Sequence, residues 1–201
     1  MKVGILGGTF DPVHLGHLIL GQEALDALAL DEVLYIPARE PWRKSERAIT
    51  PAAHRLAMLR LAVEGDARFG ISDIELRREG PTYTADTLEA LAGERLDDEF
   101  FFIMGTDALA DLPNWHDPQR IVRHATLAVA PRELQEANAA ALNAPGVASR
   151  VLTFAMPRID ISSTDIRARV AAGRPVRYFV PDAVAAYIEQ HGLYRAVTRA
   201  G

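Results

Sequence analysis

Residues 2–17 have the sequence KVGILGGTFDPVHLGH, and the fold class can be predicted from this stretch outward. Its first part, Lys2–Leu6, is a short apolar run that ends at two glycines, which is typical of a buried strand. Its last residues open Leu15–Leu28, in which apolar residues recur at helical spacing. A buried strand that passes through a glycine-rich turn directly into a helix is the building unit of a parallel α/β sheet.

The alternation of strand and helix continues along the chain. Apolar runs predict further strands at Glu32–Ile36, Glu99–Met104, Thr126–Ala130 and Val151–Ala155, with an extended segment at Phe69–Leu76. Helical spacing predicts helices at Pro51–Glu64, Thr84–Leu91, Ser163–Ala172 and Pro181–His191. Residues 37–50 indicate a loop, and Gln135–Arg150 fits either a loose helix or a loop. We expect an α/β fold, a parallel sheet flanked by helices, in one domain over residues 1–201 with a small C-terminal helical part at about 160–195.

The composition excludes several classes of protein. Hydrophobic residues make up 49% and charged residues 24%, which is typical of a globular protein. With 22 Lys and Arg against 27 Asp and Glu, the net charge of −5 argues against a nucleic-acid partner. The absence of cysteine excludes disulfides, thiolate metal sites and a cysteine nucleophile. No apolar run reaches the roughly 18 residues of a membrane span, and the first residues lack the apolar core of a signal peptide. We expect a cytoplasmic protein without a membrane partner, and the sequence leaves homo-oligomer formation open.

The turn after the first strand is the first candidate site, because ligands of parallel sheets bind at the carboxyl ends of the strands. Gly7 and Gly8 let the main chain approach a ligand closely, and the helix that follows favours an anion at its N-terminus. His14 and His17 are three residues apart, so both can face one ligand. Together with the Thr9 hydroxyl, this set suits a phosphate chain. A histidine metal pair and a purely structural turn are the alternatives, but no third metal ligand has suitable spacing.

A second candidate site is IDISSTDIR, residues 159–167. Its three hydroxyl residues, 162–164, precede an apolar-periodic stretch, which is an N-cap signal. Asp165 falls in the first turn, where the helix dipole favours an acidic residue. An ordinary capped helix is therefore one interpretation. Three hydroxyls, a helix N-terminus and Arg167 also form a suitable cradle for phosphate, which is the other interpretation.

The two motifs GGTFDPVHLGH and ISSTDIR resemble the two signatures of the HxGH nucleotidyltransferase superfamily, and they occur in the same order along the chain. Four further segments are similar to the bacterial nicotinate-nucleotide adenylyltransferases: DEVLYIPAREPWRK (31–44), HRLAML (54–59), GPTYTADTLEAL (80–91) and FIMGTDALADLPNWHD (102–117). The resemblance extends from residue 3 to about 194. It implies a Rossmann-like nucleotidyltransferase fold and adenylyl transfer from ATP to nicotinate mononucleotide, with Mg²⁺ bound to the ATP triphosphate. The products would be nicotinate adenine dinucleotide and pyrophosphate.

The resemblance also implies roles for individual residues. The catalytic set is His14, His17, Lys44 and Arg167. The ATP-binding set is Gly7, Gly8, Thr9, Phe10, His17, Gly105, Asp107, Ile161, Ser162, Ser163, Thr164 and Arg167. The set for the nicotinate nucleotide is Thr82, Tyr83, Thr84 and Trp115, with the indole stacked on the pyridine ring. We expect no side chain to be a dedicated metal ligand, and Asp11 is at most a second-layer participant.

Several of these residues have a structural alternative. Trp115 could only pack, Asp107 could cap a following short helix, and Tyr83 and Thr84 could cap theirs. His54, beside Arg55 in a predicted helix, fits a surface or packed position at least as well as a site role. The loop 41–44 is Pro-Trp-Arg-Lys, without the histidine that many members carry there, and residues 105–107 are Gly-Thr-Asp rather than Gly-Ala-Asp.

Proteins with other functions carry one or both of these signatures, so other functions remain alternatives. Phosphopantetheine adenylyltransferases share both signatures, but they are shorter and lack a comparable pairing of the TYT segment with tryptophan. Cytidylyltransferases share HxGH but usually carry a different C-terminal signature. A non-catalytic nucleotide sensor is the alternative from another class, although the intact histidines and ISSTDIR argue against it.

Overall fold

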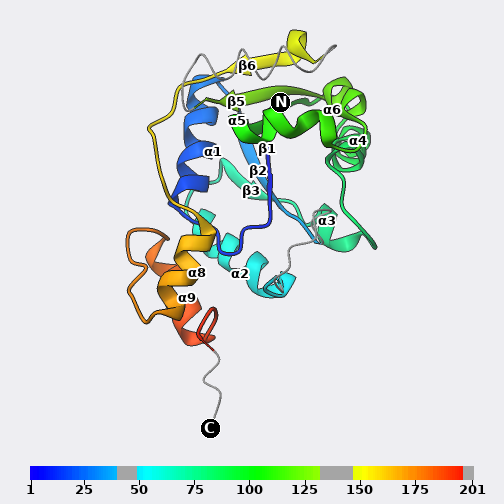
Figure 1. Ribbon diagram of the computed structural model, residues 1–201. Helices are drawn as coiled ribbons and strands as arrows, with labels where there is room; N and C mark the ends of the chain where they lie inside the picture. Colours follow the sequence, from blue (N-terminus) through cyan, green and yellow to red (C-terminus); the bar gives the residue numbers. More distant parts are fainter. Residues whose placement is uncertain (40–48, 132–146, 197–201) are drawn as a thin grey trace.

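A computed structural model describes residues 1–39, 49–131 and 147–196 (Figure 1). Six strands form one sheet in the order β3-β2-β1-β4-β5-β6, and every neighbouring pair is parallel. The strands are β1 (Lys2–Gly8), β2 (Glu32–Pro37), β3 (Phe69–Ile71), β4 (Glu99–Gly105), β5 (Ala125–Ala130) and β6 (Val151–Thr153). The predicted parallel α/β sheet is therefore confirmed.

The five predicted helices are present at the predicted places or close to them, and three further short helices occur among the described residues. The α-helices are α1 (Leu15–Ala27), α2 (Ala52–Val63), α3 (Ile74–Arg77), α4 (Thr84–Glu94), α5 (Thr106–Asp111), α6 (Pro118–His124), α8 (Ser163–Ala171) and α9 (Asp182–Gln190). Two 3₁₀ turns, Leu112–Asn114 and Ala148–Arg150, complete the described elements. No helix in residues 1–39, 49–131 and 147–196 is long and apolar enough to cross a membrane.

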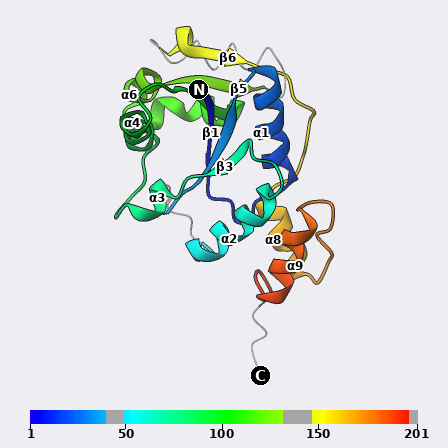
Figure 2. The same cartoon turned by 180° about the vertical axis from the view of Figure 1, so that it is seen from behind.

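The apolar strands bury both of their faces. Along β4, Phe100, Phe102 and Met104 belong to one core cluster, and Phe101 and Ile103 belong to the other. This alternation follows from the pleat, which points successive side chains to opposite faces. The first cluster is covered by α3, α4, α5 and α6, and the second by α1, α2, α8 and α9. Figures 1 and 2 show α4 and α6 side by side, with α1 on the opposite side of the sheet.

The C-terminal helices α8 and α9 lie together at the end of the molecule opposite β6 (Figures 1 and 2). Ile166 of α8 and both Val184 and Ile188 of α9 bury their side chains in the same cluster as α1 and α2. The Leu15 N–H at the start of α1 donates to the Phe179 carbonyl at 2.9 Å. The C-terminal helices are thus attached at the point where the first strand turns into the first helix.

Three predictions about local structure were wrong or incomplete. The extended segment Phe69–Leu76 is a strand only to residue 71. The Ser72 N–H ends the pairing at the Tyr35 carbonyl, and the Ser72 hydroxyl then accepts the Ile74 N–H and turns the chain into α3. The last strand ends at Thr153 rather than Ala155. Helix α6 was not predicted, and α5 was considered only as the short helix of the structural alternative for Asp107. Most of residues 37–50 and of Gln135–Arg150 lies outside the described residues.

Candidate active site

The turn that leaves β1 is folded tightly on itself. Phe10 has a φ of 49°, in the left-handed region that an aromatic residue rarely adopts. Its ring is 1% exposed and packs on Gly8, where an added Cβ would lie 3.1 Å from the ring. Gly8 is therefore required by the phenyl ring. The Phe10 side chain belongs to the core, so a contact of Phe10 with ATP would have to come from its main chain.

The two histidines of this turn lie ring against ring. His14 is the N-cap residue of α1, and the ring centroids of His14 and His17 are 3.7 Å apart at an interplanar angle of 24°. The His14 N–H donates to Nδ1 of His17 at 3.3 Å. A Cβ on Gly16 would approach Nδ1 of His14 to 3.0 Å, which is tighter than ordinary contact. The glycine between the histidines therefore gives the His14 ring its space.

Both imidazoles are neutral in the protein without ligand. Burial lowers the pKa of His14 to about 4. Burial, and then the neighbouring His14, lowers the pKa of His17 to about 3. Because Nδ1 of His17 accepts a main-chain hydrogen bond, we assign its proton to Nε2. A neutral imidazole with an Nε2–H can donate to a phosphate oxygen.

The second motif lies directly against the first, as the phosphate interpretation requires. Ser163 donates its hydroxyl to the Pro12 carbonyl at 2.8 Å. Arg167 donates to the Asp11 carbonyl at 2.7 Å and to Oγ1 of Thr164 at 3.0 Å. These bonds join residues 151 and 156 positions apart in the sequence.

The capped-helix interpretation of this motif is confirmed. The hydroxyl of Ser162 accepts the Asp165 N–H at 3.1 Å and donates to the Asp165 carboxylate at 2.6 Å. Ile161, just before the cap, packs partly buried against the core. The cap fixes the direction of the α8 N-terminus, so the structural and the phosphate interpretations are compatible.

A different part of the sheet positions the residues predicted for the nicotinate nucleotide. Thr82 is buried, Tyr83 is the N-cap residue of α4 and Thr84 is its first helical residue. The Tyr83 side chain makes no capping hydrogen bond, so the capping alternative does not account for its ring. That ring lies 4.4 Å from the ring of His116. The structure therefore brings the TYT segment next to the tryptophan segment.

Trp115 has clear packing contacts. Its indole Nε1 donates to Oδ2 of Asp111 at 2.9 Å, and its ring meets Phe102 edge-on at 6.0 Å between centroids. The indole is half-buried against the core, so its orientation is fixed by the protein itself. Stacking on a pyridine ring stays a prediction.

The residues after β4 do not have the arrangement that the structural alternative for Asp107 requires. Gly105, not Asp107, is the N-cap residue of α5, so the alternative that Asp107 caps this helix is wrong. Asp107 lies exposed in the first turn of α5. Lys44 and the rest of the loop 41–44 fall outside the described residues.

Two side chains that contact the turn were missed by the sequence analysis. Arg55 of α2 donates to the Thr9 carbonyl at 2.7 Å, and the Tyr194 hydroxyl donates to Oδ1 of Asp11 at 2.7 Å. Arg55 lies three and four residues before the buried Met58 and Leu59, so its position on the apolar face of α2 was a usable signal. Tyr194 carried no comparable signal, because its contact joins residues 183 positions apart.

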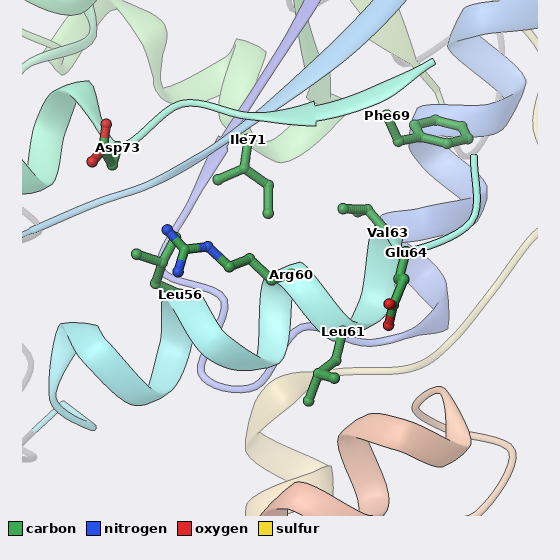
Figure 3. Close-up of a pocket in the computed structure, with 8 residues that line it drawn as sticks. All are labelled: Leu56, Arg60, Leu61, Val63, Glu64, Phe69, Ile71 and Asp73. Carbon is green, nitrogen blue, oxygen red and sulfur yellow. The ribbon is translucent and has the colours of Figure 1, made fainter. Parts of the chain in front are cut away.

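A cavity of about 560 Å³ lies between α2 and β3 (Figure 3). Figure 3 shows Leu56 and Arg60 on α2 facing Ile71 of β3. The lining contains none of the predicted site residues. Across the part of the chain that the structure describes, no three His, Cys, Asp or Glu side chains are grouped as a metal site would need.

Known proteins match this chain over almost its whole length. The family model for cytidylyltransferase-like proteins matches residues 5–169. A probable nicotinate-nucleotide adenylyltransferase of Thermomicrobium roseum is 49% identical, over 98% of this chain and 92% of that protein. One of Roseiflexus sp. is also 49% identical, over 96% and 98%.

Solved structures show the same fold. The nicotinic acid mononucleotide adenylyltransferase of Plasmodium falciparum, solved in complex with NaAD, superposes with a TM-score of 0.79 at 18% identity, over 96% of this chain and 97% of that one. The sequence matches carry the family assignment. The chain belongs to the cytidylyltransferase-like family and, within it, to the nicotinate-nucleotide adenylyltransferases.

Proposed function

We propose that this protein transfers the adenylyl group of ATP to nicotinate mononucleotide. A phosphate oxygen of the mononucleotide attacks the α-phosphorus of ATP in line, the bond from the α-phosphorus to the bridging oxygen breaks, and pyrophosphate leaves. The product is nicotinate adenine dinucleotide. The observation that carries the proposal is the contact of the two motifs, in which Ser163 and Arg167 bind the carbonyls of Pro12 and Asp11. The membership of the chain in the nicotinate-nucleotide adenylyltransferases supports the same function.

The proposed chemistry needs positioning and charge neutralisation rather than a nucleophilic side chain. A phosphate monoester is ionised at neutral pH and is itself a competent nucleophile. The developing charge on the α-phosphate would be met by the Nε2–H of His17, by His14 and by the Arg167 guanidinium. Mg²⁺ enters as part of the substrate, bound to the triphosphate, where it offsets negative charge.

The remaining phosphates would lie between the two motifs. The main chain at Gly7 and Gly8 and the hydroxyl of Thr9 are on one side. The N-terminus of α8 with its hydroxyls at 162–164 is on the other side, and a helix N-terminus favours anions. We assign Lys44 to the same phosphates, and Gly105 and Asp107 to the adenosine ribose, from the family resemblance.

The nicotinate nucleotide would bind where the TYT segment meets the tryptophan segment. Tyr83 and His116 are in ring contact there, and Trp115 is held by Asp111. An indole face suits a cationic pyridinium ring. Thr82 and Thr84 flank Tyr83 at the start of α4, where main-chain N–H groups favour the nicotinate carboxylate.

The test is an end-point assay with purified protein, ATP and Mg²⁺. Nicotinate mononucleotide, nicotinamide mononucleotide and phosphopantetheine are run in parallel, and the products are resolved by chromatography. We expect nicotinate adenine dinucleotide and pyrophosphate in equal amounts, with poorer turnover of the amide. Turnover of phosphopantetheine alone would replace the substrate, and ATP binding without any turnover would indicate a nucleotide sensor.

A further inference from the structure

The buried side chain of Arg55 holds three separate segments of main chain. The residue is 1% exposed in α2. Its guanidinium donates to the Thr9 carbonyl at 2.7 Å, to the Thr50 carbonyl at 2.9 Å and to the Arg39 carbonyl at 3.3 Å. A buried guanidinium carries a large desolvation cost, which only a full set of partners offsets. The side chain therefore has a specific structural task.

One of the three carbonyls, that of Thr9, belongs to the proposed phosphate site. Thr9 lies in the turn that carries the histidines. Arg39 and Thr50 flank residues 40–48, which contain Lys44. Arg55 thus ties Arg39 and Thr50 to the phosphate turn. A guanidinium carries its N–H donors on three separate nitrogens, so it can bind three carbonyls that lie apart. A lysine carries all its donors on one nitrogen and cannot reach all three carbonyls in the same way.

Asp11 supplies the negative charge next to this cation. Its carboxylate is 3% exposed and accepts the Tyr194 hydroxyl at 2.7 Å and the Thr50 N–H at 3.4 Å. Burial lowers the pKa of Arg55, and the Asp11 carboxylate opposes that shift. Tyr194 has a φ of 62°, a conformation that a bulky residue keeps only where the surrounding fold imposes it. The surrounding fold therefore fixes the Tyr194 main chain, and its ring packs partly buried against the core.

We propose that Arg55 is a positioning residue for the phosphate turn, and that Asp11 and Tyr194 complete its network. By fixing the Thr9 carbonyl, Arg55 sets the plane of the peptide bond between Thr9 and Phe10. It thereby holds the turn that places the Thr9 hydroxyl and His14 against the triphosphate. Phosphoryl transfer depends on such placement, because an error of about 1 Å costs on the order of a hundredfold in rate. This inference rests on the proposed adenylyl transfer.

The main test compares two arginines of the same helix. Arg55→Met removes the network, Arg55→Lys keeps the charge without the fork, and Arg60→Met is the control at an exposed position of α2. We expect Arg55→Met to lower kcat at least tenfold and to raise the KM for MgATP, while the KM for nicotinate mononucleotide changes less than twofold. Arg55→Lys should fall between this variant and the wild type, and Arg60→Met should match the wild type. Values for Arg55→Met within twofold of the wild type would overturn the proposal.

A second variant decides the matter where Arg55→Met does not fold. Tyr194→Phe removes one hydroxyl and keeps the ring, with Tyr178→Phe, 76% exposed, as its control. We expect the affinity for MgATP, measured by calorimetry, to fall about threefold or more for Tyr194→Phe only. Equal affinities of Tyr194→Phe and the wild type would overturn the proposal. This readout needs no turnover, so a wild type that does not adenylylate nicotinate mononucleotide would refute the proposed function and leave the network testable.

Discussion

The two sides of the proposed active site are held together in different ways. On the phosphate side, hydrogen bonds connect residues 151 to 183 positions apart, from Pro12 to Ser163 and from Asp11 to Tyr194. On the nicotinate side, the indole of Trp115 is held by Asp111, four residues earlier. Thr87 likewise bonds the Tyr83 carbonyl four residues before it. The ring contact of Tyr83 with His116 spans 33 positions, far fewer than the contacts on the phosphate side.

This difference has a physical consequence. A network of distant contacts forms only when the whole sheet is folded, so the phosphate side is preorganised by the global fold. Local contacts within α4 and around α5 can adjust without disturbing that network. We therefore expect changes on the phosphate side to affect the chemical step, and changes on the nicotinate side to affect the binding of one substrate.

The largest expected effect is that of His17→Ala. Removing the Nε2–H donor should lower kcat by about 10² or more, because a donor aimed at the transition state contributes about that factor. The fold should be retained, since the helix start also depends on the Leu15 bond to Phe179. Steady-state kinetics measures kcat, and circular dichroism shows whether the fold is retained. His124→Ala, at the end of α6, is the control, and a folded His17→Ala variant with near-normal kcat would contradict the assignment.

The next effect is on stability at acid pH. The pKa of His17 is about 3 in the folded protein and near 6.5 when unfolded, so the unfolded state binds more protons between these values. Stability should therefore rise with pH up to about 6.5 and be lost on acidification. Between pH 5 and 6, His17→Asn should reduce the slope of unfolding free energy against pH by about 1.2 kcal/mol per unit. Urea unfolding of both proteins at several pH values measures this slope. Equal slopes for the wild type and His17→Asn would contradict the lowered pKa.

The same distinction between local and distant contacts explains what could be predicted from the sequence. The strand at Glu99–Met104 was predictable because six consecutive residues carry the buried-strand pattern, and the structure adds only Gly105. The two motifs proposed to bind phosphate could be located because each is a local pattern, one of glycines and histidines and the other of hydroxyl residues before a helix. Helix α6 was missed although Asp117 caps it and Pro118 opens it, a signal within two residues.

The Arg55 network could not be predicted in this way. Its partners come from the turn after β1, from Arg39 and Thr50, and from the segment after α9. Neither Asp11 nor Tyr194 has a sequence neighbour that reveals the contact. What makes these residues partners is the packing of α9 against α2 and of α8 against the phosphate turn. This packing is a property of the folded chain.

A smaller effect is expected for Trp115→Ala on the nicotinate side. The loss of one aromatic stacking partner should raise the KM for nicotinate mononucleotide about three- to tenfold, since such contacts contribute about 0.5–1.5 kcal/mol beyond buried area. The KM for MgATP should change less than twofold. Trp115→Phe keeps a ring and should recover part of the affinity. Equal changes for both substrates would show that the indole only packs against Phe102.

The smallest expected effects are those of removing one helix cap on each side of the site. Ser162 caps α8 on the phosphate side, and Asp117 caps α6 beside the nicotinate side. Ser162→Ala should lower the unfolding free energy by about 1 kcal/mol, the usual cost of losing a side-chain cap. Asp117→Ala should cost at least as much, because its φ of 47° also disfavours alanine.

Only one of the two caps should influence ATP. The α8 N-terminus is proposed to face the triphosphate, so a loosened first turn in Ser162→Ala should raise the KM for MgATP severalfold. Asp117→Ala loosens a helix whose N-terminus has no proposed phosphate, so its KM for MgATP should stay within twofold of the wild type. Urea unfolding and steady-state kinetics on both variants measure the pair. A similar rise in both KM values would show that ATP binding follows general stability, and that the phosphate side has no privileged connection to the fold.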